Sequence, residues 1–184
     1  MIGIIERFGA WGVFALMVPE SACVPIPSEV TLLFSGFAVH QGWMSFPLAV
    51  VAATAGNLVG SLIAYGVGAS RVLAGVPVVR GVLGRWESLI ERQGTRAIFT
   101  ARLLPLARTF VSLPAGARNV PIWPFVVLTT LGCAIWATAL VSAGVLAGAA
   151  WVTVSSVLGR VLLAAGVGIL LVTLVRGASG RARR

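Results

Sequence analysis

Four charged side chains stand within the most apolar parts of this sequence. Glu20 and Glu29 bound the segment ESACVPIPSE, and Arg102 and Arg108 bound the segment RLLPLAR. Two of the chain's five acidic residues therefore fall within one short segment. If these apolar parts lie in a bilayer, each charge costs about 3 kcal/mol or more and usually faces a partner, water or a substrate. The four charges are the first candidates for a functional site.

The arginines are of the type that binds phosphate. A guanidinium donates two parallel hydrogen bonds and keeps its proton, and Arg102 and Arg108 lie on either side of Pro105, where both can grip one phosphate. With both glutamates ionised the four-charge site is neutral, so an incoming anion would leave negative charge uncompensated at low dielectric. Protonation of Glu20 or Glu29 would remove that cost, and burial favours the neutral carboxyl. These charges lead to a hypothesis: the entry of a phosphate group is coupled to protons through Glu20 and Glu29.

The same charges also permit a purely structural interpretation. Two glutamates and two arginines can pair with one another and hold their segments together, as buried ion pairs do at some cost in stability. Pairing and ligand binding are compatible, since a phosphate can compete with the carboxylates for the arginines.

Composition places the whole chain in a membrane. Of its 184 residues, 58% are hydrophobic and 10% are charged, and the mean hydropathy is +1.00, which the surface of a water-soluble domain would not tolerate. All 14 basic residues are arginine, and the net charge is +9. In a membrane protein such charges flank the spans and contact anionic lipids, so we expect no nucleic-acid partner. The expected fold is an all-α polytopic membrane protein with one domain over residues 1–176.

Two apolar runs near the start, Phe8 to Val18 and Val30 to Val39, are too short to cross a bilayer. At a rise of 1.5 Å per residue each reaches roughly 16 Å, about half of the ~30 Å hydrocarbon thickness. A continuous helix between them is excluded by three prolines, namely Pro19, Pro25 and Pro27. Half-length helices joined at such a break predict a re-entrant hairpin over residues 8–40, buried in protein or facing a wet cavity.

The segment 97–116 repeats this pattern. The apolar stretches AIFTA and TFVSL lie on either side of Arg102, Pro105 and Arg108, and the second stretch ends at Pro114. We therefore predict a second re-entrant hairpin in this segment.

Three further segments, 46–68, 121–148 and 157–175, are long and apolar enough to span the bilayer. Asn57 and Tyr65 are polar exceptions in the first of them and are candidates for lining a cavity. Small residues recur at every fourth position of the same span and predict close packing of another helix; they are Ala52, Gly56, Gly60, Ala64 and Gly68.

Residues 76–92 have apolar side chains at helical spacing and charges on the other face, which predicts an amphipathic helix on the membrane surface. The arginines around this helix and the basic tail, residues 177–184, favour a cytoplasmic location for both, the C-terminus included. Counting the crossings, the first hairpin then opens from the outer side and the second from the cytoplasmic side. This is the inverted-repeat architecture of secondary transporters.

In these motifs the chain resembles the DedA family, also called SNARE-associated or VTT-domain membrane proteins. The resemblance covers roughly Val18 to Gly148 and rests on three motifs in order. These are Glu20 with PIPSE at 25–29, then Gly56, Asn57, Gly60, Tyr65 and Gly68, and then FTARLLPLARTFVSLPAG at 99–116. Departures from the family pattern occur at Ser28, Ala101 and Leu106, where glycine is common.

The resemblance implies two facing re-entrant hairpins, the acidic pair on the first and the arginine pair on the second. It also implies lipid transport in the bacterial cytoplasmic membrane: recycling of a polyprenyl phosphate carrier such as undecaprenyl phosphate, or flipping and scrambling of phospholipids. Carried over by position, the functional charges are Glu20, Glu29, Arg102 and Arg108. The hairpin breaks and motif positions are Pro25, Pro27, Pro105 and Gly116.

Two other function classes remain open: a proton- or sodium-coupled antiporter of a small solute, and a membrane-organising protein that transports nothing. An enzyme is not expected, because the sequence has no aspartate and its charged motifs have no histidine. We expect no metal and no cofactor. The expected partners are lipid phosphates and protons, with the oligomeric state open.

Overall fold

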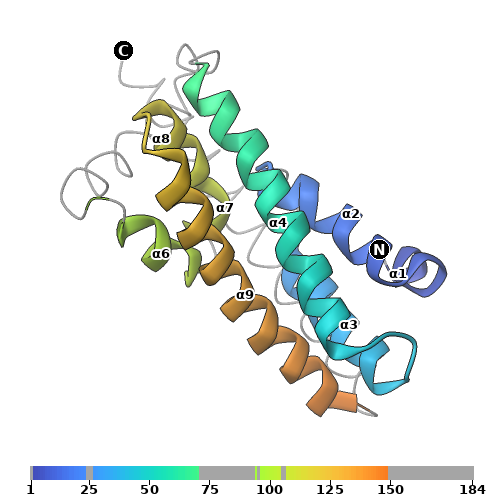
Figure 1. Ribbon diagram of the computed structural model, residues 1–184. Helices are drawn as coiled ribbons and strands as arrows, with labels where there is room; N and C mark the ends of the chain where they lie inside the picture. Colours follow the sequence, from blue (N-terminus) through green and yellow to red (C-terminus); the bar gives the residue numbers. More distant parts are fainter. Residues whose placement is uncertain (1, 24–26, 71–93, 95, 105–106, 149–184) are drawn as a thin grey trace, which may run out of the picture. The chain divides into compact units, whose positions relative to one another are not determined.

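The computed structural model describes residues 2–23, 27–70, 94, 96–104 and 107–148, and these ranges contain helices and no strand (Figure 1). The chain divides into two compact units, Met1–Gly148 and Ala149–Arg184. All described residues belong to the first unit. The predicted amphipathic helix, the span at 157–175, the basic tail, Pro25 and Pro105 lie outside the described residues. The single domain over 1–176 stays a prediction.

The first hairpin segment contains three helices: α1 (Ile2–Phe8), α2 (Ala10–Ser21) and α3 (Ser28–His40). Phe8 ends α1 and does not begin α2, because Gly9 between them has a φ of 54°, which interrupts the helix. α2 also continues through Pro19 to Ser21. Placing Pro19 in the break was therefore wrong.

The continuation past Pro19 has a simple cause. Proline lacks only its own N–H, and the following turn still closes, since Ala22 N donates to the carbonyls of Val18 and Pro19. The helix ends where Cys23 has a φ of 71°, in the left-handed region. Glu20 consequently lies in the last helical turn.

The second hairpin segment contains α6 (Arg96–Arg102), α7 (Ala107–Phe110) and α8 (Ser112–Ala117). Val111 between α7 and α8 has helical backbone angles, φ −61° and ψ −23°, and its N–H bonds to the Ala107 carbonyl. The prediction that this stretch ends at Pro114 was wrong. Pro114 lies near the start of α8, where a missing N–H breaks few helical bonds.

Two long helices run beside these short ones: α4 (Phe46–Ala69) and α9 (Ile122–Ala147), with 24 and 26 residues. At 1.5 Å per residue each reaches about 36–39 Å, more than the ~30 Å hydrocarbon thickness. Both are apolar enough to cross a membrane by length and composition. Their positions agree with the segments predicted at 46–68 and 121–148.

The short helices pack on the long ones in an exchanged pattern. α4 contacts α2 and α8, whereas α9 contacts α3 and α6, and α4 and α9 contact each other (Figure 1). Each long helix therefore packs against one helix of the hairpin segment that precedes it in the sequence and one helix of the other hairpin segment. Two structural repeats related by a two-fold axis would produce this exchange.

Glycines at the helix crossings show the same relation. A Cβ on Gly36 would meet the carbonyl of Val141, and a Cβ on Gly144 would meet the carbonyl of Leu33. Backbone therefore touches backbone where α3 crosses α9.

The crossing of α8 and α4 has the same form. A Cβ on Gly116 would meet the carbonyl of Tyr65, and a Cβ on Gly68 would meet the carbonyl of Leu113. The two crossings correspond at fixed offsets: 33 and 36 to 113 and 116 on the short helices, and 65 and 68 to 141 and 144 on the long ones. We call these two halves, α2–α4 and α6–α9, repeat 1 and repeat 2.

The predicted stripe of small residues on α4 does pack closely. Gly56 lies against the backbone of Phe14, Gly60 lies against that of Val18, and Gly68 contacts α8 as described. One face of α4 thereby holds a helix from each hairpin segment.

Candidate functional site

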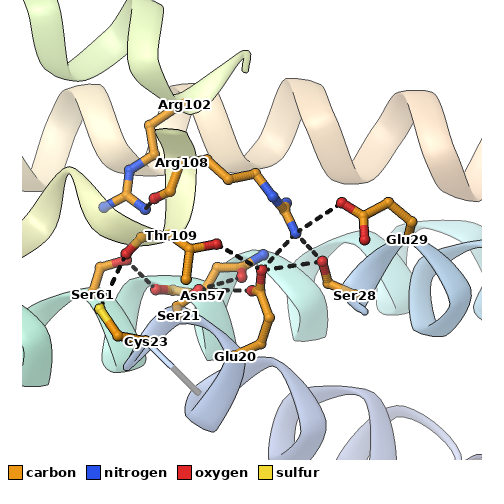
Figure 2. Close-up of polar contacts among 10 residues, drawn as sticks. All are labelled: Glu20, Ser21, Cys23, Ser28, Glu29, Asn57, Ser61, Arg102, Arg108 and Thr109. Atoms are coloured by element: carbon orange, nitrogen blue, oxygen red, sulfur yellow. Dashed lines mark hydrogen bonds and ion pairs between the residues drawn. The ribbon is translucent and has the colours of Figure 1, made fainter. Parts of the chain in front are cut away.

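Three charged side chains meet where α2, α3 and α7 come together (Figure 2). Arg108 Nη2 lies 2.8 Å from Glu20 Oε1 and 4.0 Å from Glu29 Oε1. Arg108 and Glu20 are each 4% exposed, while the Glu29 side chain is 24% exposed. Opposite charges from the two hairpin segments therefore meet in a mostly buried place.

The two glutamates are held very differently. Glu20 Oε1 accepts hydrogen bonds from Arg108 Nη2 at 2.8 Å, Ser28 Oγ at 3.1 Å and Thr109 Oγ1 at 3.3 Å, and Oε2 lies 3.1 Å from Ser21 Oγ. These donors offset the loss of water around a buried carboxylate. Glu29 makes a longer approach, with its Oε1 4.0 Å from Arg108 Nη2. Glu20 is thus the fixed partner of Arg108, and Glu29 the looser one.

Ser28 joins the pair. Its hydroxyl accepts a hydrogen bond from Arg108 Nη2 and donates to Glu20 Oε1. Ser28 and Arg108 also correspond to each other under the 80-position offset of the short helices. Two residues at matching positions of the two hairpin segments are therefore in direct contact at the charged site.

Arg102 has a different surrounding. It is 2% exposed, and its guanidinium is bound by neutral oxygens: Nη1 donates to the backbone carbonyl of Arg108 at 2.5 Å, and Nη2 donates to Ser112 Oγ at 2.7 Å and Thr129 Oγ1 at 3.4 Å. No carboxylate of the described residues lies within ion-pair distance of it. Arg102 therefore fixes the backbone that carries Arg108 (Figure 2).

Aromatic rings cover both guanidiniums. The Arg108 Cζ lies 5.1 Å from the centroid of the Trp136 ring, and the Arg102 Cζ lies 6.0 Å from that of Phe125. Both rings belong to α9, which approaches α6 at Gly132, where a Cβ would stand 2.5 Å from Arg102 Cβ. Such cation–π contacts favour a buried positive charge.

The two polar candidates of α4 differ in placement. Asn57 is 1% exposed, and its Oδ1 accepts a hydrogen bond from Ser21 at 2.5 Å, which connects it to Glu20. Tyr65 instead donates to the Val120 carbonyl at 2.6 Å, and its ring lies 4.9 Å from that of Phe125. Asn57 belongs to the charged site, whereas Tyr65 joins the helix packing. Cavity lining stays a prediction for both.

The motif positions fall outside the charge contacts. Pro27 immediately precedes α3, and Gly116 is the crossing residue of α8. Sequence reasoning missed the polar partners Ser28, Thr109, Ser112 and Thr129, as well as Trp136. The four hydroxyl residues gave only a weak signal in the sequence, because hydroxyl side chains in apolar helices usually bond to their own backbone.

The described ranges contain no group of three or more His, Cys, Asp or Glu side chains that could hold a metal. Cys23 and Cys133 are both free thiols. The chemistry of the site is therefore that of two guanidiniums, two carboxylates and their hydroxyl partners.

Comparison with known proteins identifies the family. The VTT domain matches residues 26–146, which include Glu29, Arg102 and Arg108. The chain belongs to the VTT-domain family, the DedA proteins. This VTT-domain protein is accordingly an integral membrane protein, and no solved structure was found to match it.

Several relatives of this VTT-domain protein carry names. It is 34% identical over 86% of its length, and 79% of the relative's, to an "Alkaline phosphatase-like protein" of Lactococcus lactis subsp. cremoris. It is 28% identical over 73% of its length, and 71% of the relative's, to "Undecaprenyl phosphate transporter A" of Bacillus subtilis. A protein of the same name from Staphylococcus aureus is 27% identical, over 76% of this chain and 74% of the relative. The transporter names support a role in membrane transport.

Proposed function

We propose that this protein moves a lipid phosphate across the bacterial cytoplasmic membrane. The substrate is a polyprenyl phosphate carrier lipid or a phospholipid headgroup, whose tail stays in the bilayer while the headgroup passes the charged site. The observation that carries the proposal is the buried Arg108 guanidinium, with carboxylates from α2 and α3 at 2.8 and 4.0 Å. The relatives named undecaprenyl phosphate transporters support the same substrate class.

The chemistry of Arg108 suits a phosphate. A phosphate can take the place of the Glu29 carboxylate, whose side chain is 24% exposed and lies 4.0 Å from Nη2, as the second negative group near Arg108. The 2.8 Å contact to Glu20 is then kept, and the unbonded Nε of Arg108 is the donor left for a phosphate oxygen. Charge-assisted bonds from arginine to phosphate are among the strongest that proteins form. Arg102 contributes positive charge and holds Arg108 in place.

The membrane arrangement follows from helix lengths. α2 and α3 have 12 and 13 residues and reach only about 18–20 Å, whereas α4 and α9 can cross. We propose that the α2–α3 and α6–α8 segments are re-entrant hairpins entering from opposite sides, as in inverted-repeat transporters. Such irregular backbone is tolerated because α4 and α9 pack around it. A third span at 157–175 and a cytoplasmic C-terminus complete the proposal.

Protons provide the coupling in this proposal. Arg102, Arg108, Glu20 and Glu29 together carry no net charge when all are ionised, so an entering phosphate adds uncompensated negative charge. Protonation of a glutamate offsets that charge. Glu29 is the proposed proton carrier, because it is the more exposed and the less bonded of the two.

The test is reconstitution in phosphatidylcholine liposomes with a fluorescent polyprenyl phosphate, whose movement is followed by quenching from outside. Arg108→Gln should lower the rate at least tenfold. Arg96→Gln, at an exposed arginine that begins α6, is the matched control and should keep the rate. Equal rates in the two variants would contradict phosphate binding by Arg108.

One observation favours the membrane-organising alternative: Arg108 already has a carboxylate partner at 2.8 Å, as a purely structural ion pair would. In that case wild-type liposomes would show no lipid movement above protein-free liposomes. An antiporter would instead move protons in response to a small solute in liposomes that hold no lipid phosphate.

A further inference from the structure

Hydrogen-bond donors without acceptors gather at the charged site. Five buried side-chain atoms of the described residues have no hydrogen-bond partner, and four are N–H groups: Asn57 Nδ2, Arg102 Nε, Arg108 Nε and Trp136 Nε1. Asn57, Arg102 and Arg108 are each at most 4% exposed. Buried donors of this kind are rare and costly. A group made only of acceptors, such as a phosphate, would satisfy them.

Trp136 belongs to this group by position. Its ring lies against the Arg108 guanidinium, with 5.1 Å between Cζ and the ring centroid. The Nη2 atom of Arg108 is used by Glu20 and Ser28, whereas its Nε is unbonded. Arg108 Nε and Trp136 Nε1 are thus two free N–H groups on side chains in direct contact.

Packing alone does not explain a tryptophan at this position. In the offset of the long helices, position 136 corresponds to position 60. Gly60 has no room for a Cβ, since the Val18 carbonyl and the Ser21 Cβ lie against it. In repeat 2 the corresponding position is occupied by an indole, whose ring lies against the guanidinium of Arg108. Trp136 is therefore a departure from the repeat, located at the charged site.

We propose that Trp136 and Arg108 Nε together bind one oxygen of a phosphate monoester, with the indole N–H as donor. This inference rests on the proposed lipid phosphate function and adds a headgroup-binding residue to it. The ring face supports the guanidinium, while the ring nitrogen recognises the ligand. A neutral hydroxyl headgroup gains far less from these donors, because bonds to a charged acceptor are about twice as strong.

The test measures binding by purified, detergent-solubilised full-length protein in calorimetric titrations. The probes are farnesyl phosphate, inorganic phosphate and farnesol, which separate a lipid phosphate from a free phosphate and from a bare isoprenoid chain. Trp136→Phe keeps an aromatic ring over Arg108 but lacks the N–H. Trp123→Phe, at a 76% exposed tryptophan of the same helix, is the matched control.

Farnesyl phosphate should bind the wild type and Trp123→Phe equally, and Trp136→Phe about tenfold more weakly or worse, as for a lost bond to a charged acceptor. Equal affinity of the two variants would overturn the role of Trp136 and leave the proposed function standing. Weaker binding of inorganic phosphate by Trp136→Phe, without any binding of farnesyl phosphate, would support the anion site and contradict the lipid substrate. Absence of binding by the wild type with both phosphates would contradict both.

A second measurement covers the case in which Trp136→Phe does not fold. The chain has six tryptophans, and the indole N–H signals of ¹⁵N-labelled wild type can be assigned by substituting the other five in turn. The Trp136 signal should move downfield when farnesyl phosphate is added and stay in place with farnesol. A signal that does not move with farnesyl phosphate would overturn the proposal.

Discussion

Arg102 binds the backbone of Arg108: its Nη1 donates to the Arg108 carbonyl at 2.5 Å. The two arginines that bound one short motif thus have unequal surroundings. Arg108 faces the carboxylates of α2 and α3. Arg102 anchors the backbone of α7, the helix that carries Arg108. A single motif therefore supplies both a charged group and its support.

Arg102→Lys should destabilise the protein, because an ammonium cannot reach the Arg108 carbonyl, Ser112 and Thr129 in the same fork geometry. The free energy of unfolding should fall by about 2–4 kcal/mol, because the hydrogen bonds of a buried charged group are broken. Thermal unfolding in detergent measures the effect. Arg96→Lys is the exposed control, and equal melting temperatures would contradict the anchoring role.

Glu20→Gln should also reduce stability, by about 3 kcal/mol, since it leaves Arg108 with a weaker partner and turns an amide toward hydroxyl donors. Glu29→Gln should change the melting temperature much less, because Glu29 stands 4.0 Å from Arg108 and is partly exposed. A larger drop in melting temperature for Glu29→Gln than for Glu20→Gln would contradict the assignment of Glu20 as the fixed partner of Arg108.

Glu29→Gln should remove the pH dependence of lipid phosphate transport in liposomes, because the proposed proton carrier is then absent. The rate, measured over a pH series, should become flat in this variant and stay pH-dependent in Arg96→Gln. An unchanged pH profile in both Glu29→Gln and Glu20→Gln would exclude coupling through these carboxylates.

Gly116→Ala should force α8 away from α4, since the added Cβ would overlap the backbone carbonyl of Tyr65. Gly36→Ala should do the same at the equivalent crossing of α3 and α9. The free energy of unfolding of each variant should fall by about 1–3 kcal/mol or more, as for overpacking of a core. Gly66→Ala on α4 has open space around it and should be neutral or stabilising by up to about 1 kcal/mol. Thermal unfolding that does not separate Gly66→Ala from the other two variants would contradict the close crossings.

Apolar length and proline position were enough to predict helices near 46–68 and 121–148 and interruptions beside Glu20–Glu29 and Arg102–Arg108. They did not predict helix ends. Pro19 lies inside α2 because the hydrogen bonds of the following turn still form. Gly9 interrupts the helix earlier, between α1 and α2, through its positive φ. These ends depend on backbone geometry, which apolar pattern does not reveal.

The charge contacts followed from a different kind of information. Four charges in apolar surroundings indicated that Glu20 and Arg108 need partners, and both have them. The unequal roles of Arg102 and Arg108, and the placement of Ser28 and Trp136, depend on how α6, α7 and α9 pack. Sequence spacing within one motif says nothing about such contacts between helices.

A solid-state NMR distance measurement decides whether a lipid phosphate contacts Arg108. The protein carries ¹⁵N-labelled arginine in a phosphorus-free detergent, and farnesyl phosphate is the only source of ³¹P. We expect a ³¹P–¹⁵N contact of roughly 4 Å, as in arginine–phosphate pairs, present in the wild type and Arg96→Gln and lost in Arg108→Gln. A contact that persists unchanged in Arg108→Gln would contradict this expectation.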